Sequence, residues 1–224
     1  MNHLLVGRVL SLGLLMIVVV LALSTCGGDE KKAKARPLPE DPKALGPGTY
    51  RSEEFKPSLS FRVGKGWSSS PLEASDSLFI KRGETMDLGF TKPQEVYKPT
   101  KDEALQIVDA PKDLVGWFQH HPHLQTDKPE PVTVGGVKGE QFDVVVADLP
   151  EDYESVCGSD CVGIVRLSTG SQAILTAGYK LRLIVLEDVQ GETVTLGFGG
   201  PASTFDEFAP EAQKVLDTVK WRDS

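Results

Sequence analysis

Basic residues are scarce relative to acidic residues in this chain of 224 residues. Lysine and arginine number 24 against 32 aspartates and glutamates, which leaves a formal net charge of −8 at pH 7. Proteins that bind nucleic acid obtain much of their affinity from basic side chains that neutralise phosphates. The sequence also contains no DNA- or RNA-binding motif. The composition therefore argues against nucleic acid as a partner.

The motifs of common enzyme classes are absent as well. The sequence contains no G-x-S-x-G, no H-E-x-x-H, no Walker A pattern and no G-x-G-x-x-G. The glycine-rich segment Gly197–Gly200 lacks the spacing of a phosphate loop, and we interpret it as the exit of a strand. These absences predict a protein without catalysis and without a cofactor, although distant residues can still assemble a catalytic triad.

The N-terminal apolar run is short for a membrane span. Val9–Leu23 has fifteen residues, which form roughly 22 Å of helix, against a hydrocarbon core of ~30 Å. Arg8 precedes the run and small residues lead from it to Cys26. This arrangement is typical of a secretory signal peptide. An uncleaved transmembrane anchor is the alternative.

Leu23-Ser24-Thr25-Cys26 resembles the lipobox of bacterial lipoproteins, in which the cysteine is lipidated and becomes the first residue of the mature chain. The resemblance implies a lipoprotein signal peptide at residues 1–25. It also implies an anchor of acyl chains, such as palmitate, on Cys26. Two such chains bury far more CH₂ groups than the single chain that binds only reversibly. The membrane is thus one expected partner, on its extracytoplasmic face.

Residues 26–48 are predicted to form a disordered tether behind the lipidated cysteine. Gly27–Gly48 is rich in glycine, proline, alanine and charge and has no apolar period, so it cannot bury enough surface to fold. Its basic residues either contact anionic lipid or, as we favour, form a solvated spacer. These basic residues are Lys31, Lys32, Lys34 and Arg36.

From residue 49 to 224 the sequence predicts a single α+β domain. Apolar residues alternate with polar ones in several short segments, which is typical of half-buried strands. The strands expected from this pattern span residues 59–63, 78–82, 86–91, 142–146, 162–167, 179–187 and 192–198. We expect them to form a twisted, mainly antiparallel sheet.

Two helices are expected to cover this sheet. A short one spans Asp113–His120, between Pro111 and Pro122. A long C-terminal helix follows from apolar residues at spacings of three, four and seven between Phe205 and Val219. Pro210 falls inside this range, and proline disrupts a helix interior. Two starts of the helix are therefore left open: one capped by Ser203 or Thr204, and one at Pro210 with Phe205–Ala209 as a preceding turn.

The element pattern resembles the PsbP/Mog1-like α/β/α sandwich over roughly residues 49–221. The resemblance rests on Ser60-Phe61-Arg62-Val63-Gly64-Lys65-Gly66-Trp67, which closes an early hairpin with a tryptophan. A late run of strands and a final amphipathic helix that leads to Trp221 complete it. It implies a non-catalytic domain that docks on protein partners or helps assembly, and it supplies no site residues.

Three groups of residues are candidates for chemistry. Cys157 and Cys161 predict a structural disulfide in an exported domain; a redox pair is disfavoured because C-x-x-C spacing and a thiolate-stabilising neighbourhood are missing. His120, His121 and His123 are weak candidates for metal ligands, because successive helical residues point in different directions. An acidic loop could supply oxygen ligands to Ca²⁺, but it lacks the EF-hand pattern. Its acidic residues are Asp148, Glu151, Asp152, Glu154 and Asp160.

The sequence therefore favours a lipid-anchored extracytoplasmic binding or assembly module without catalysis, which docks a protein or envelope ligand. This hypothesis predicts an exposed groove or patch of apolar side chains. The alternative is a cell-surface enzyme, either a hydrolase or a thiol redox protein, with a deep pocket where a nucleophile and a base converge. A structural envelope protein, with neither feature, is the third possibility.

Overall fold

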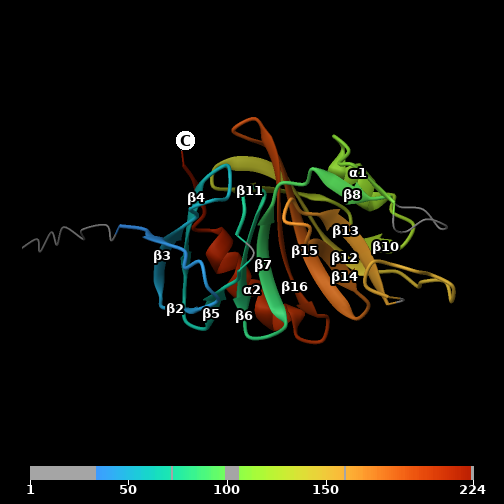
Figure 1. Cartoon of the computed structure of the whole chain (residues 1–224), viewed down its shortest axis with the longest axis horizontal. Coiled ribbons are helices and arrows are strands. Elements are labelled where there is room, and N and C mark those ends of the chain that lie inside the picture. The colour runs from blue at the N-terminus through green and yellow to red at the C-terminus, as the bar shows by residue number, and fades with distance from the viewer. Residues whose placement is uncertain (1–33, 72, 99–105, 159, 223–224) are drawn as a thin grey trace, which may run out of the picture. The chain divides into compact units, whose positions relative to one another are not determined.

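Antiparallel strands dominate the structure, as the alternating pattern predicts. The computed structural model describes residues 34–71, 73–98, 106–158 and 160–222. In this part of the chain a nine-stranded central sheet carries a four-stranded sheet on each of its sides (Figure 1). We call these smaller sheets the β4 sheet and the β13 sheet.

The central sheet consists, in spatial order, of β10 (Leu124–Thr126), β12 (Val137–Val146), β15 (Tyr179–Val189), β16 (Glu192–Pro201), β7 (Met86–Thr91), β6 (Ser77–Arg82), β5 (Trp67–Ser69) and β2 (Ala44–Leu45), with β11 (Glu130–Val134) also paired to β12. The β4 sheet consists of β1 (Arg36–Pro37), β3 (Gly48–Arg51), β4 (Leu59–Val63) and β17 (Lys220–Trp221). The β13 sheet consists of β14 (Gln172–Thr176), β13 (Cys161–Arg166), β8 (Glu95–Tyr97) and β9 (Ile107–Asp109). Only β1 and β3 pair in parallel among these strands of the described chain.

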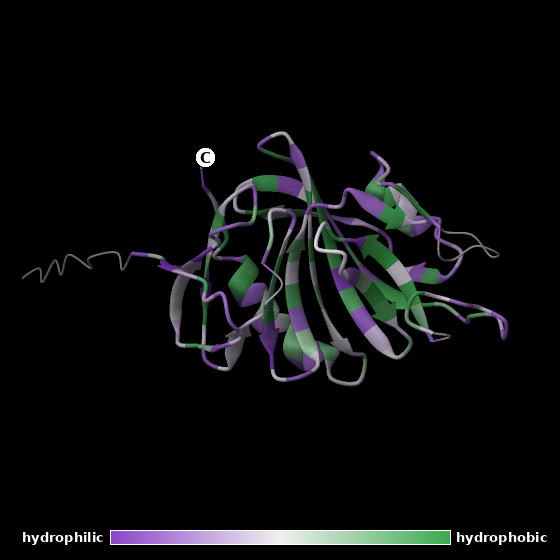
Figure 2. Cartoon of the chain, viewed as in Figure 1, coloured by the Kyte–Doolittle hydropathy of each residue, from purple (hydrophilic) through white to green (hydrophobic). Residues whose placement is uncertain are grey.

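Each face of the central sheet packs against its own hydrophobic core. Phe90 and Phe198 belong to the core that lies against α2 (Phe205–Leu216) and the β4 sheet. Phe142 and Leu183 belong to the core that lies against α1 (Leu114–Gln119) and the β13 sheet. Alternate residues of a strand point to opposite faces, and Figure 2 shows the resulting hydrophobic and hydrophilic bands along the strands. The expected twisted antiparallel sheet with covering helices is therefore present.

The C-terminal helix is shorter than expected. α2 has 12 residues, so the prediction of a long helix is wrong, and it starts at Phe205 after the N-cap Thr204, with Pro210 in its interior. The chain leaves the helix after Leu216 because its last residues pair with β4 instead, as strand β17. The indole Nε1 of Trp221 donates to the carbonyl oxygen of Val134 at 3.1 Å. The pairing of the half-buried Trp221 with β4 thus replaces a further helical turn.

The second half of the predicted tether is structured. Arg36 and Pro37 pair with β3, and Ala44 and Leu45 pair with β5. Leu38 and Leu45 are buried in the core next to α2. Ordered structure is expected only from residue 49 onward, but it begins by residue 36. The predicted signal peptide (residues 1–25), Cys26 and the predicted tether up to residue 33 lie outside the described residues. Within the part described, no helix has the length and apolar character needed to cross a membrane.

The buried carboxylate of Asp143 ties β12 to β15 on the α2 side of the sheet through the partly exposed Arg182 and Lys180. The Asp143 carboxylate accepts hydrogen bonds from Arg182 Nε at 2.6 Å and Nη2 at 3.0 Å, and Lys180 Nζ lies 2.7 Å from its Oδ2. Burial alone raises the pKa of Asp143, but the hydrogen bonds and charges of Arg182 and Lys180 outweigh burial and hold it below its ordinary value. The carboxylate therefore stays charged at neutral pH.

Candidate functional site

Three rows of residues cross strands β6, β7 and β16 on the face of the central sheet that looks toward the β13 sheet. The strand register places one residue from each strand in every row. We call them the charged row (Lys81, Asp87 and Gly199), the glycine row (Phe79, Gly89 and Gly197) and the hydroxyl row (Ser77, Thr91 and Thr195). Because alternate residues share a face, the three rows form one continuous surface.

An apolar cleft lies over this surface. Its volume is about 300 Å³, at the lower end of the range for small-molecule sites. The glycine row forms its floor, Leu181 and Leu183 of β15 flank the floor, and β13 and β14 contribute apolar residues to the opposite wall. The cleft is a depression between two packed sheets whose lining is mainly hydrocarbon.

Two positions of the cleft floor carry no side chain of their own, and neighbouring side chains occupy the space that this leaves. A Cβ atom on Gly89 would collide with the ring of Phe79, and one on Gly197 would lie 3.1 Å from Leu181 Cδ1. The interpretation of Gly197–Gly200 as a strand exit is wrong, since β16 continues to Pro201. The alternation of Gly197 and Gly199 around the buried Phe198 is the signal that could have revealed a bare strand face.

The two ends of the cleft differ. At the charged row, Lys81 Nζ lies 3.7 Å from Asp87 Oδ1, and both side chains are nearly half exposed. Burial raises the pKa of Asp87, and Lys81 only partly offsets this. At the hydroxyl row, the Oγ atoms of Thr91 and Thr195 are 2.5 Å apart and both residues are buried. The charged row therefore forms the open mouth and the hydroxyl row the inner end.

A hydrogen-bonded contact closes the inner end. The buried Asp76 carboxylate accepts from the backbone N–H of Ser168 at 2.7 Å and from its hydroxyl at 2.8 Å. Ser168 lies in the turn between β13 and β14, directly after Leu167, which lines the cleft. Hydrogen bonds to a charged acceptor are stronger than neutral ones, so Asp76 holds this hairpin against β6.

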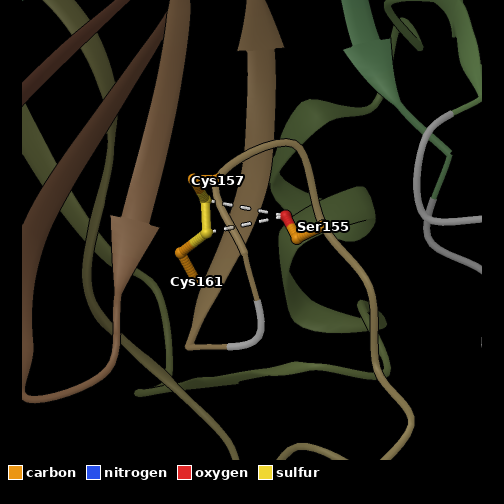
Figure 3. The surroundings of a disulfide bond; sticks show 3 residues. All are labelled: Ser155, Cys157 and Cys161. Atoms are coloured by element: carbon orange, nitrogen blue, oxygen red, sulfur yellow. Dashed lines mark hydrogen bonds between the residues drawn. A yellow bond between two sulfur atoms is a disulfide. The ribbon is translucent and has the colours of Figure 1, made fainter.

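The predicted disulfide is present between Cys157 and Cys161. Their Cα atoms are 6.1 Å apart, and Figure 3 shows the Ser155 hydroxyl facing both sulfur atoms, at 3.7 Å from each. The bond closes the end of the acidic loop just before β13. It lies outside the residues that line the cleft.

The three histidines do not converge on one point. His120 is exposed, with its Nδ1 2.7 Å from the Gly116 carbonyl oxygen, whereas His121 and His123 are buried. The His121 and His123 rings have centroids 6.1 Å apart. Burial, and then repulsion from His123, lowers the pKa of His121 to about 4. Within residues 34–222, apart from those left undescribed, no three histidine, cysteine or acidic residues are arranged to hold a metal ion.

No protein-family model and no curated protein matches this sequence. Among solved structures, the chain is similar to cyanobacterial PsbP (CyanoP) from Synechocystis sp. PCC 6803, with 11% identity and a TM-score of 0.39 over 89% of this chain and 99% of that one. It is also similar to LpqN, a protein involved in cell envelope biogenesis of Mycobacterium tuberculosis, with 8% identity and a TM-score of 0.29 over 80% of this chain and 90% of that one. PsbP is the family that the sequence resembles. At these scores neither neighbour's role transfers to this chain, so its function has to be inferred from the cleft.

Proposed function

We propose that this protein is a lipid-anchored extracytoplasmic binding or assembly module without catalysis, which docks an apolar group of a protein or envelope ligand in the cleft. The observation that carries the proposal is the cleft itself, with a floor formed by Phe79, Gly89 and Gly197 and with mainly apolar walls. Sites of this kind bind through apolar contact, while a few polar groups orient the ligand. Here those polar groups lie at the two ends.

The chemistry of the cleft supports binding over hydrolysis. No histidine or cysteine is present among the described residues that line it, and its carboxylate, Asp87, is paired with Lys81. A serine or threonine nucleophile needs an adjacent general base. The buried His121 and His123 instead contact the rings of Trp117 and Tyr153, respectively. The Cys157–Cys161 pair, with three residues between its cysteines, also departs from the C-x-x-C spacing of thiol redox proteins.

Filling the floor of the cleft is expected to block binding. A Gly197→Val substitution places two methyl groups above the floor, and we expect it to weaken the binding of the fluorescent probe anilinonaphthalene sulfonate, an anion with an apolar ring system, about tenfold or more. The full chain in lipid nanodiscs would be titrated, with empty nanodiscs as the blank. Gly64→Val is the matched control, because a Cβ at Gly64 meets no atom within 4 Å. A folded Gly197→Val variant that binds the probe as tightly as the parent would refute the cleft as the site.

The proposed anchor is tested by the mass of the protein in the membrane fraction. We expect the mature chain to begin at Cys26 and to carry the added mass of its acyl chains. Cys26→Ala should abolish that added mass, whereas a variant with Cys157→Ser and Cys161→Ser should retain it, because those sulfur atoms are joined in the disulfide. A mature chain that begins at an unmodified Gly27 would remove lipidation from the proposal.

A further inference from the structure

A buried hydroxyl group without a hydrogen-bond partner in the described part of the chain, that of Ser77, lies next to the inner end of the cleft, across from Thr91 in the strand register. Ser77 is fully buried, and among the described residues its Oγ has no hydrogen-bond partner. Its neighbours in the hydroxyl row, Thr91 and Thr195, line the cleft and bond to each other. Buried hydroxyls are rarely left unpaired, because they have lost their hydrogen bonds to water. An alanine in place of Ser77 would avoid this cost, so the hydroxyl points to a ligand.

The backbone of the cleft floor has no hydrogen bonds to offer. β7 pairs with β6 on one side and with β16 on the other, and β16 pairs in turn with β15. A peptide laid across the glycine row would therefore bury its own N–H and C=O groups against the Phe79 ring and against main chain that is already paired, which is unfavourable. A hydrocarbon skeleton has no such groups. The floor thus favours a ligand whose middle part is entirely apolar.

These two observations together define a class of ligand. On the basis of the proposed function, we propose that the cleft binds an elongated apolar molecule. The leading end of this molecule carries a hydroxyl or carbonyl oxygen, and the hydroxyl row binds that oxygen. The oxygen accepts a hydrogen bond from Thr91 or Thr195 at the inner end. When one hydroxyl of the threonine pair turns to the ligand, the pair lacks a hydrogen-bond donor. Ser77 lies directly across from Thr91 in the strand register and supplies that donor. The apolar body lies on the glycine row and its trailing end faces the mouth.

The test compares two molecules that share a skeleton and differ by one hydroxyl, 4-phenyl-1-butanol and butylbenzene. Both would displace the fluorescent probe from the full chain in lipid nanodiscs, and each variant would be compared with the parent so that partition into lipid cancels. We expect Ser77→Ala and Thr195→Val each to weaken the alcohol about fivefold and to leave butylbenzene unchanged. Ser77→Ala removes no hydrogen bond of the fold, so it provides the result if Thr195→Val unfolds.

The outcomes separate this inference from the proposed function. If Gly197→Val blocks both molecules while Ser77→Ala and Thr195→Val leave the preference for the alcohol unchanged, the cleft binds ligands but the hydroxyl row does not select them, and the inference fails. If Gly197→Val blocks neither molecule, the cleft is not the site and both proposals fall. Selective loss of the alcohol in Ser77→Ala supports both.

Discussion

Acidification from neutral pH to pH 4 is expected to lower the free energy of unfolding by about 3 kcal/mol through His121 alone. Burial, and secondarily the charge of His123, lowers the pKa of His121 from its ordinary 6.5 to about 4. The unfolded chain therefore takes up a proton on this ring as the pH falls below 6.5, while the folded protein does so only near pH 4. Stability that is fully present above pH 6.5 is lost progressively across this window.

His121→Asn is the variant that isolates this effect. His121 Nδ1 accepts a hydrogen bond from the backbone N–H of His123 at 3.2 Å, and the oxygen of an asparagine side chain can accept the same bond. Urea unfolding at pH 7 and pH 4 should show that the variant escapes most of the acid loss of the parent. His120→Asn, at the exposed neighbouring histidine, should retain it.

Apart from the two substituted histidines, the groups that titrate are common to the three proteins in this comparison. The pKa of Asp143 is held below its ordinary value of 3.8 by Arg182 and Lys180 despite burial, so its contribution to stability is lost only as the pH falls below that value. Asp143 is also present in the parent and in both histidine variants, so its contribution cancels when their losses of stability are compared. An equal loss of stability in the parent and in His121→Asn would show that His121 is not the group responsible.

Phe198→Ala is expected to destabilise the domain by about 3–5 kcal/mol, the range for removal of a buried phenylalanine. Phe198 is 1% exposed and projects from β16 away from the cleft, toward α2. Its ring centroid lies 5.8 Å from that of Phe205, with the rings stacked, and 6.1 Å from that of Phe208, edge to face. Truncation would leave a cavity between the sheet and the helix that rigid strands cannot close.

Urea unfolding of Phe198→Ala, followed by circular dichroism, measures this loss. Val108→Ala is the control, because Val108 is an exposed residue of β9 and surface truncations usually change stability by less than about 0.5 kcal/mol. If Phe198→Ala loses no more stability than Val108→Ala, the ring does not hold α2 against β16. Gly197 and Gly199 lie on the opposite face, so probe binding in the still-folded fraction should persist.

Several elements could be predicted from local patterns with correct bounds. Residues 59–63 and 86–91 form β4 and β7 as expected, and the short helix, expected at 113–120, spans 114–119. β4 and the short helix each have one face buried, so the apolar period in the sequence matches the burial in the structure. The strands β1 and β2 have two residues each, too few to show any period, and this is why residues 36–45 were expected to be unstructured.

The C-terminal segment shows how packing overrides a local pattern. The helical spacing of apolar residues runs on to Val219, but the helix ends at Leu216. The hydroxyl of Thr218 accepts a hydrogen bond from the backbone N–H of Arg62 at 2.8 Å, and this contact leads into the pairing of β17 with β4. No residue near Thr218 in the chain indicates that contact.

The sequence by itself determined the alternation of the strands, the pairing of Cys157 with Cys161, the acidic charge and the absence of common catalytic motifs. These depend on residue type and on neighbours a few positions apart. Only the tertiary structure decided the cleft and its inner end, where Thr91 and Thr195 meet although they are 104 residues apart in the chain. Their meeting depends on strand register and on the packing of whole sheets, which are set by the combined free energy of distant segments and not by any local spacing.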